Sequence, residues 1–104
     1  DIVLGNSSSG IIEAPSFKTA TINLGDRQEG RLQSQSVINC KIAKKYIKKG
    51  INKAYSKKFR SNIRSSKNPY EKQNTAKKIY NFLKTCKIPT NTKKLFFDLK
   101  QWLD

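Results

Sequence analysis

Three short apolar runs alternate with polar segments in the first forty residues of the chain. The runs are DIVLG at residues 1–5, TATINL at residues 19–24 and SVINC at residues 36–40. Each has the length of a buried strand, and the first two end at or just before a glycine, which is typical of a strand end. The pattern therefore predicts three short strands.

The segment between the first two runs has the apolar spacing of a helix. Serines just before it are residue types that start helices, so we expect the helix to begin near Ser9 or Gly10 and to carry Ile11, Ile12, Ala14 and Phe17 on its apolar side. Pro15 lies early enough in this segment to be tolerated in the first turns.

Helical spacing dominates after residue 41. Apolar residues recur every three or four positions in residues 42–55 and 76–83, with lysines on the opposite face of the first of these segments. A short helix at residues 56–63, a turn at residues 65–69 and a helix end at Ile88-Pro89 complete this part of the pattern. A last apolar stripe predicts one more helix and is made by Leu95, Phe96, Leu99, Trp102 and Leu103.

The order of these elements favours an α/β fold with a parallel sheet, in which short strands are followed by several helices. Residues 25–35 are polar, contain two glycines and form the expected loop between the second and third strands. Three strands make a small sheet, the chain contains no Met, and its first residues already have the pattern of a strand. We therefore expect a fragment of a longer chain.

Positive charge is concentrated in the second part of the chain. The net charge is +15, and because residues 1–35 hold three cations against four acids, the remaining 69 residues carry +16. A basic segment of this kind indicates a nucleic-acid-binding module as one alternative. Lysines outnumber arginines 18 to 4, however, whereas surfaces that read phosphates rely more often on guanidinium forks. The composition therefore weighs against nucleic acid as the partner.

The two cysteines argue against a metal site or a disulfide scaffold. Cys40 and Cys86 lie far apart and the chain has no His, so no metal-ligand spacing is present. We expect free thiols in a reducing cytoplasm. No apolar run approaches the roughly 18 residues of a membrane span. We expect neither a membrane partner nor a cofactor.

The stretch GNSSSG at residues 5–10 combines features that suit an anion. Ligands of open parallel sheets collect at the carboxyl ends of the strands, where this stretch leads into a helix. The first N–H groups of a helix have no internal partners, and its dipole favours negative charge. Ser7 and Ser8 add hydroxyl donors, and Gly10 allows a ligand close to the backbone. We expect a phosphate or diphosphate site on a Rossmann-like half-domain, although SSSG lacks the glycine spacing of the common phosphate loops.

Three charged residues near this stretch leave alternatives open. Glu13 is equally well explained as a first-turn acid that favours the helix dipole or as an acid that binds paired hydroxyls, as on a ribose. Arg27 and Arg31 follow the second strand and reach the same edge of the sheet, where each could bind a phosphate or a sugar. The alternative for either arginine is a solvated loop. With no His and only seven acids, the chain offers no catalytic dyad.

Two long motifs, GNSSSGIIEAPSF and TINLGDRQEGR, closely resemble the hydrolysing UDP-N-acetylglucosamine 2-epimerases of the sialic-acid pathway. Their spacing fits that family, and SVINC, the basic helix after it, KNPY and LFFDL look like the family's C-terminal end. The resemblance covers nearly the whole chain. It implies a glycosyltransferase-B-like fold of two Rossmann-like domains, with this chain as the last part of the second. Residues 1–40 would be a nucleotide-sugar-binding β/α segment, and residues 41–104 a basic C-terminal helical segment of the same domain.

The resemblance also implies a reaction and roles for individual residues. The family eliminates UDP from UDP-N-acetylglucosamine by breaking the C1–O bond, and adds water to the resulting 2-acetamidoglucal to release N-acetylmannosamine. Ser7 and Ser8 would hold the diphosphate, and Glu13 would bind the ribose hydroxyls. Arg27 would lie near the nucleotide sugar, and Arg31 would be the second basic residue of its motif. Because the acid/base carboxylates and the histidine of the family lie upstream, we expect the isolated chain to be inactive.

One departure from the family concerns the turn after the first motif. Members commonly carry Gly and Pro there, whereas this chain has Lys18-Thr19-Ala20, which leaves the geometry of the turn open. The implied partners are a UDP-sugar and the missing N-terminal domain, on which the stripe with Trp102 is expected to pack. A homo-oligomer stays open. A glycosyltransferase of the same architecture is the second functional alternative, and a nucleic-acid-binding module is the third.

Overall fold

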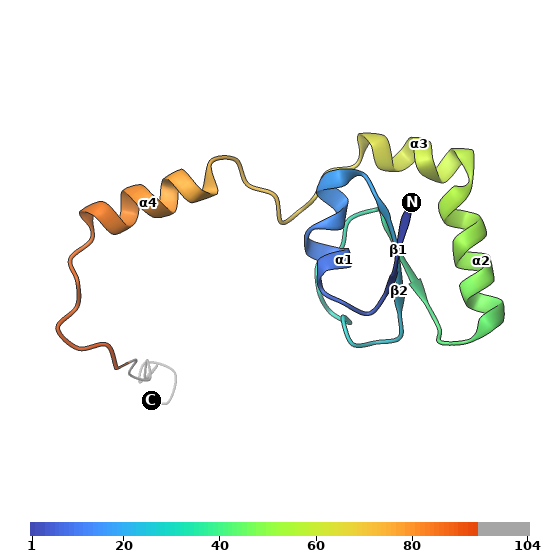
Figure 1. The fold of residues 1–104 in the computed structure, drawn as a ribbon, viewed down its shortest axis with the longest axis horizontal. Helices are drawn as coiled ribbons and strands as arrows, with labels where there is room; N and C mark the ends of the chain where they lie inside the picture. Colours follow the sequence, from blue (N-terminus) through green and yellow to red (C-terminus); the bar gives the residue numbers. More distant parts are fainter. Residues whose placement is uncertain (94–104) are drawn as a thin grey trace, which may run out of the picture. The chain divides into compact units, whose positions relative to one another are not determined.

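The structure is a computed structural model that describes residues 1–93. It divides the chain into two compact units, unit 1 (Asp1–Lys72) and unit 2 (Gln73–Asp104). Unit 1 contains a three-stranded parallel sheet with the order β1-β2-β3 (Figure 1). The strands are β1 (Ile2–Gly5), β2 (Ala20–Leu24) and β3 (Val37–Cys40). The α/β class, the parallel sheet and the three predicted strands are confirmed.

The central strand owes its position to its apolar sequence. Four of the five residues of β2 are buried, as in strands of parallel sheets that are covered on both faces. Ile22 lies opposite Leu4 on one side and Ile38 on the other, and it is completely buried. The β-branched side chains of this strand fit a pleated, buried surface well.

The main hydrophobic core lies where α2 (Lys44–Tyr55) and α3 (Lys57–Ser65) pack on the sheet. Its buried members are Ala20, Ile22, Ile38, Cys40, Ala54 and Ile63. Both helices were predicted, α2 from its apolar spacing, although α2 begins two residues after Ile42, which is exposed. Because α2 and α3 share one core with the sheet, residue 40 does not separate two hydrophobic cores. The functional division predicted at residue 40 stays a prediction.

The helix predicted from Ser9 to Phe17 is divided into two short pieces. These are α1 (Ser9–Ile12) and the 3₁₀ helix η1 (Ala14–Phe17). Pro15 has no N–H and cannot donate the α-helical hydrogen bond to the carbonyl of Ile11, which explains why the second piece tightens. The prediction that Pro15 would be tolerated within one helix is therefore wrong. Figure 1 shows α1 and α2 on opposite faces of the sheet.

The turn after η1 is made by a lysine in an unusual conformation. Lys18 has a φ of 55°, in the left-handed region that glycine adopts at lower cost. Its N–H donates to the carbonyls of Ala14 and Pro15, which closes the end of η1. Its Nζ donates to the carbonyl of Ser66, beyond α3. The departure Lys18-Thr19-Ala20 thus makes a left-handed turn that a long-range hydrogen bond supports.

Unit 2 contains α4 (Thr75–Thr85), which confirms the helix predicted there. The helix ends three residues before the predicted Ile88-Pro89 boundary, with Cys86 as its cap. No residue of α4 is buried, and its large apolar side chains, Ile79, Tyr80, Phe82 and Leu83, are each more than half exposed. The predicted stripe from Leu95 to Leu103 lies outside the described residues. None of the helices in the described part of the chain has the length and apolar character that a membrane crossing requires.

The two free thiols differ in accessibility. Cys40 is buried in the core of unit 1, whereas Cys86 is partly exposed at the end of α4. We expect Cys86 to react with iodoacetamide at least about tenfold faster than Cys40 under native conditions, because Cys40 must wait for an opening of the core. Timed alkylation followed by peptide mass spectrometry measures both rates. In urea the two rates should converge, and equal rates in native buffer would contradict the burial of Cys40.

Candidate functional site

The loops that follow β1 and β2 meet at the carboxyl ends of these strands. The side chain of Gln28 donates from Nε2 to the carbonyl of Asn6 at 2.9 Å. The guanidinium of Arg27 donates from Nη1 to Oδ1 of Asn6 at 3.5 Å. These two contacts hold the loop at residues 25–36 against the loop at residues 6–8. Arg27 therefore lies beside the serine stretch, as expected for strands that end at the same edge.

The serine stretch is partly closed by hydrogen bonds within the chain. The N–H of Ser9 donates to Oγ of Ser7 at 3.3 Å, and the two hydroxyls lie 3.0 Å apart. The N–H of Gly10 donates to the carbonyl of Ser7 at 3.3 Å. The expectation that the first N–H groups of the helix itself are free is therefore wrong at Ser9 and Gly10, because the tight turn supplies acceptors for both.

The free donors lie one step earlier in the chain. Among the described residues, neither the N–H of Ser7 nor that of Ser8 has a hydrogen-bond acceptor in the protein. Ser8 is the N-cap of α1, and its side chain makes no capping hydrogen bond. The loop thus presents two consecutive backbone N–H groups and the Ser8 hydroxyl. Successive N–H groups of this kind form anion-binding concavities.

Gly10 has a structural reason to be glycine. It is buried, and a Cβ built on it would lie 2.6 Å from Cγ2 of Thr21 on β2. The hydroxyl of Thr21 donates to the Gly10 carbonyl at 2.7 Å. The absence of a side chain therefore lets α1 approach the sheet closely. Its predicted role of admitting a ligand stays a prediction.

Glu13 lies at the opposite end of α1 from the serines. It is the residue that follows Ile12 and caps the helix, with its N–H donating to the carbonyl of Ser9 at 2.9 Å. Glu13 is also the N-cap of η1, so the acid lies at the start of that 3₁₀ helix and not in the first turn of α1, and both interpretations of Glu13 stay predictions. The side chain is exposed, and within the described residues its carboxylate has no partner. It is free to bind a ligand.

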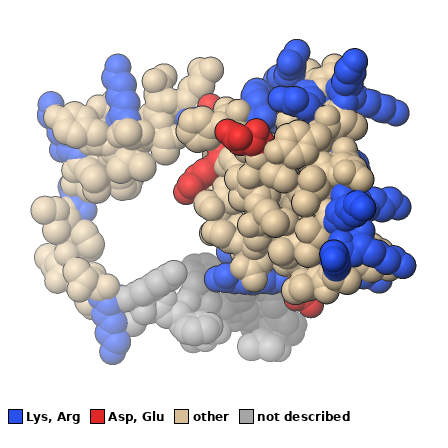
Figure 2. All heavy atoms as spheres, turned by 45° about the vertical axis from the view of Figure 1, so that its right-hand side comes forward, with Lys and Arg blue, Asp and Glu red and all other residues tan. Residues whose placement is uncertain are grey.

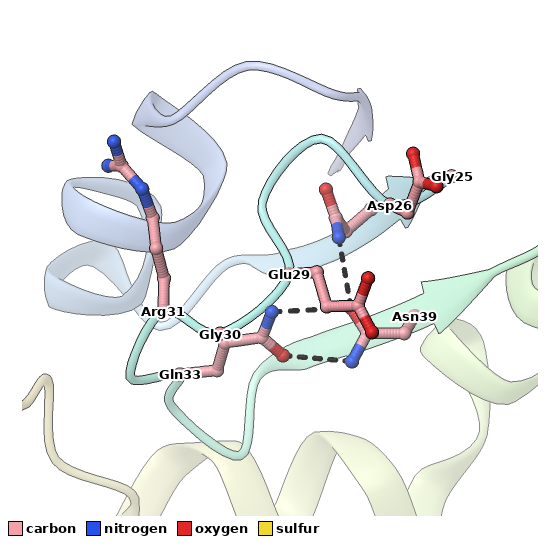
Figure 3. Close-up of a pocket in the computed structure, with 8 residues that line it drawn as sticks. Gly25, Asp26, Glu29, Gly30, Arg31, Gln33 and Asn39 are labelled. Atoms are coloured by element: carbon pink, nitrogen blue, oxygen red, sulfur yellow. Dashed lines mark hydrogen bonds between the residues drawn. The ribbon is translucent and has the colours of Figure 1, made fainter.

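A polar hollow of about 390 Å³ adjoins these loops at the ends of β2 and β3 (Figure 3). Its residues are Asn23, Gly25, Asp26, Glu29, Gly30, Arg31, Gln33 and Asn39. Oδ1 of Asn39 accepts from Asn23 at 2.9 Å, and Nδ2 of Asn39 donates to Gln33 at 2.9 Å. Figure 3 shows the guanidinium of Arg31 pointing away from the Gln33–Asn39 pair. In the described part of the chain, Arg31 makes no hydrogen bond to the serine loop, so the structure does not bring it to Ser7 and Ser8 as it brings Arg27.

Sequence reasoning missed the residues that assemble this edge. Asn6 and Gln28 join the two loops, and the exposed fraction of Gln28 is only 4%. No local signal marks Gln28, which lies among charged residues of a polar loop. The pair Asn23 and Asn39 did carry a signal, because both strands end in Ile-Asn followed by an apolar residue and the parallel register places the two asparagines opposite each other.

The cations of unit 1 gather on α2, α3 and their flanks (Figure 2). Residues 41–67 contain nine lysines and two arginines and no acid. The side chains are exposed, and Lys41 and Lys45 lie 5.8 and 5.1 Å from the ring centre of Tyr46. This face accounts for the basic character that the sequence showed in its second part.

The family model described as UDP-N-acetylglucosamine 2-epimerase matches residues 1–84. The chain belongs to this family. The resemblance seen in the two motifs is thereby confirmed, and the match includes the sheet, the serine loop, the Arg27 loop and nearly all of α4.

Three relatives carry related names. "Polysialic acid biosynthesis protein P7" of Escherichia coli is 51% identical over 72 residues, which are 69% of this chain and 18% of that protein. "UDP-N,N'-diacetylbacillosamine 2-epimerase (hydrolyzing)" of Legionella pneumophila is 40% identical over 88 residues, which are 85% of this chain and 22% of that protein. "GDP/UDP-N,N'-diacetylbacillosamine 2-epimerase (hydrolyzing)" of Campylobacter jejuni is 60% identical over 40 residues, 38% of this chain and 10% of that protein.

This member of the 2-epimerase family thus spans between 10% and 22% of the length of the relatives that it matches. No solved structure matches the chain significantly. The match establishes the family of this segment, and it does not establish the activity of a whole enzyme.

Proposed function

We propose that this chain is the UDP-binding portion of a hydrolysing UDP-N-acetylglucosamine 2-epimerase and that it holds the diphosphate leaving group. Family membership supports the reaction class. The observation that carries the assignment to this segment is the pair of free N–H groups at Ser7 and Ser8 beside the cationic side chain of Arg27. Two oriented N–H donors and a guanidinium suit a diphosphate.

The proposed contribution to catalysis is stabilisation of the leaving group. When the C1–O bond of the sugar breaks, negative charge develops on the oxygen of the departing UDP. Hydrogen bonds to that charge strengthen as the bond lengthens, so donors fixed in advance lower the barrier more than they strengthen substrate binding. We propose that the Ser8 hydroxyl and Arg27 join the two N–H groups in this role, and that Arg31, which makes no hydrogen bond to the serine loop within the described residues, contributes as a second cation of the Arg27 loop.

Glu13 is proposed to bind the ribose hydroxyls. It is exposed, its carboxylate has no partner among the described residues, and it lies one helical turn from Ser9. A carboxylate near a phosphate loop can accept hydrogen bonds from ribose hydroxyls, as the acid of dinucleotide-binding folds does from a different place in the chain. The Campylobacter relative is named for both GDP and UDP, so the choice of nucleobase is left to contacts elsewhere.

The remaining chemistry is assigned to the rest of the enzyme. The described residues contain no cluster of three or more His, Cys, Asp or Glu that could hold a metal ion. The proposed partner is a second Rossmann-like domain that supplies the acid/base groups. The exposed apolar side chains of α4 are proposed to pack against the rest of the enzyme, because exposed apolar surface of this extent marks an interaction site.

A UDP titration tests the proposal. We expect the ¹⁵N-labelled chain to show UDP-dependent shifts of the backbone amides of Ser7, Ser8 and Glu13, with uridine as a control that lacks the diphosphate. Uridine should leave the Ser7 and Ser8 amides unmoved. The chain alone should release no N-acetylmannosamine from UDP-N-acetylglucosamine. Unchanged amide shifts at millimolar UDP in a folded sample would overturn the binding role. Measurable N-acetylmannosamine would overturn the proposal that the acid/base groups lie in the rest of the enzyme.

The cationic face of α2 and α3 keeps nucleic-acid binding as a second candidate. Phosphate binding by lysines releases counterions, so a real interaction would lose affinity steeply as salt increases. Binding of a short DNA duplex measured at two salt concentrations decides this point. Indifference to DNA and RNA at low salt would remove the candidate without touching the UDP site.

A further inference from the structure

The segment that follows α3 returns to the helices beside the proposed nucleotide site. Residues 66–71, SKNPYE, include the KNPY motif, which the UDP site does not use. Lys18 donates to the carbonyl of Ser66, and the hydroxyl of Ser16 donates to Glu71 at 3.1 Å. These contacts join residues that are 48 and 55 positions apart in the chain. The segment is thus attached at one end to Lys18, the cap of η1, and at the other end to Ser16 within η1.

Asn68 is the centre of this attachment. Its exposed fraction is 8%, and Nδ2 donates to the carbonyl of Ile12 and to the hydroxyl of Ser16, both at 2.7 Å. Its Oδ1 accepts from the N–H of Tyr70 at 3.0 Å. The turn is closed by the N–H of Glu71, which donates to the Asn68 carbonyl at 3.2 Å. Asparagine followed by proline suits this geometry, because asparagine bonds its own turn and proline sets the next φ.

The carbonyl of Ile12 belongs to the last residue of α1 and has no partner inside the helix. Asn68 supplies that partner from a distant part of the sequence. The same peptide group contains the N–H of Glu13, which donates to Ser9 at 2.9 Å. Both polar atoms of the Ile12–Glu13 peptide are therefore held, one by α1 itself and one by Asn68.

We infer that Asn68 is a positioning residue, which fixes the peptide that carries Glu13 and so aims the Glu13 carboxylate at the ribose of a nucleoside diphosphate. This inference rests on the proposed role of Glu13 in the UDP site. It assigns the KNPY motif to nucleotide recognition through Glu13, without contact between the motif and the ligand.

The variant Asn68→Asp provides the most selective test. It keeps the acceptor for Tyr70 and removes both Nδ2 donors. Losing the hydrogen bond to the partly buried carbonyl of Ile12 should raise the Kd for UDP by about three- to tenfold. Inorganic pyrophosphate has no ribose, so its Kd should change less than about twofold, since its contacts with Ser7 and Ser8 are kept. Calorimetric or NMR titrations with UDP and with pyrophosphate measure both changes in Kd.

Three further chains make the readout specific. Asn68→Ala removes the donors without adding charge. Like Asn68→Asp, it should raise the Kd for UDP more than the Kd for pyrophosphate. Asn52→Asp makes the matched change of charge on an exposed residue of α2 and should change neither affinity. In a Glu13→Ala background, Asn68→Asp should have no further effect on UDP, because positioning matters only while the carboxylate is present.

The outcomes separate this inference from the function on which it rests. If the unmodified chain binds neither UDP nor pyrophosphate, the proposed function fails and the inference fails with it. If the unmodified chain binds UDP and Asn68→Asp binds it equally well, only the inference fails. Equal losses of UDP and pyrophosphate, or a full additional loss in the Glu13→Ala background, would show a general structural role and would also overturn it.

Discussion

Replacing Gly10 with alanine is expected to lower the free energy of unfolding of unit 1 by about 1–3 kcal/mol, the usual cost of overpacking a core. The new Cβ would lie 2.6 Å from Cγ2 of Thr21 and 3.5 Å from Cγ1 of Val3. Thr21 is 2% exposed, and its hydroxyl is held by the Gly10 carbonyl, so the side chain has little room to turn aside. Either α1 must move away from β2 or the sheet must distort.

Urea unfolding followed by circular dichroism measures this effect, and a second substitution identifies its cause. Thr21→Ser removes Cγ2 but keeps the hydroxyl that donates to Gly10. In the Gly10→Ala background it should recover part of the lost stability, although alone it costs stability through the lost methyl. Gly30→Ala is the contrasting variant: its φ of 79° makes alanine strained, but no atom lies within 4 Å of the added Cβ, so it measures a backbone cost without overpacking, and Thr21→Ser should not relieve it. A Gly10→Ala chain as stable as the parent would contradict the close approach of α1 to the sheet.

The strands and most helices were predictable because their signals are local. Short apolar runs marked the three strands, the first two of which end at or before a glycine, and amphipathic spacing with lysines on the opposite face marked α2. The predicted helix at residues 9–17 failed at Pro15, where the loss of one N–H outweighed the apolar spacing on either side. Periodicity reports which face is buried, whereas it does not report whether each backbone hydrogen bond can form.

The site was predictable only where topology alone places residues together. Ser7, Ser8 and Arg27 follow neighbouring parallel strands, and the structure confirms that the loop of Arg27 meets the serine loop. Gln28 and Asn68 were not predictable, because each acts through a carbonyl far away in sequence, at Asn6 and at Ile12. Which backbone N–H groups stay free also depends on turn geometry, which residue types do not specify.

Gln28 shows how such residues can be recognised afterwards. Its Nε2 donates to the carbonyl of Asn6, but its Oε1 is buried and has no partner among the described residues. A buried polar atom without a partner costs free energy, so a glutamine is not placed there for stability alone. The contact with Asn6 holds the loop of Arg27 against the serine loop. We infer that Gln28 serves to assemble the proposed site, in spite of its unsatisfied oxygen.

The largest effect on binding is expected from Ser8→Pro, which should raise the Kd for UDP by about tenfold to a hundredfold, the range for losing a hydrogen bond to a charged group. Ser8 has a φ of −62°, which proline adopts without strain, and its N–H has no acceptor in the described chain. The substitution therefore removes two donors from the proposed diphosphate loop, the N–H and the hydroxyl of Ser8, and no hydrogen bond from the fold. Urea unfolding should be nearly unchanged, while titration with UDP reports the loss.

Ser8→Ala is the paired variant, because it keeps the N–H and removes the hydroxyl. If the backbone donor dominates, Ser8→Ala should lose less affinity than Ser8→Pro, and a stable Ser8→Pro chain with unaltered UDP affinity would refute the diphosphate loop. Ser8→Pro should weaken pyrophosphate as strongly as UDP, since its N–H is proposed to meet the diphosphate. Loss of the Glu13 carboxylate should weaken UDP alone. Equal losses in Ser8→Pro and a loss confined to UDP in the Glu13 variant would place the diphosphate at the start of α1 and the ribose at its end, which a site of unspecific positive charge could not reproduce.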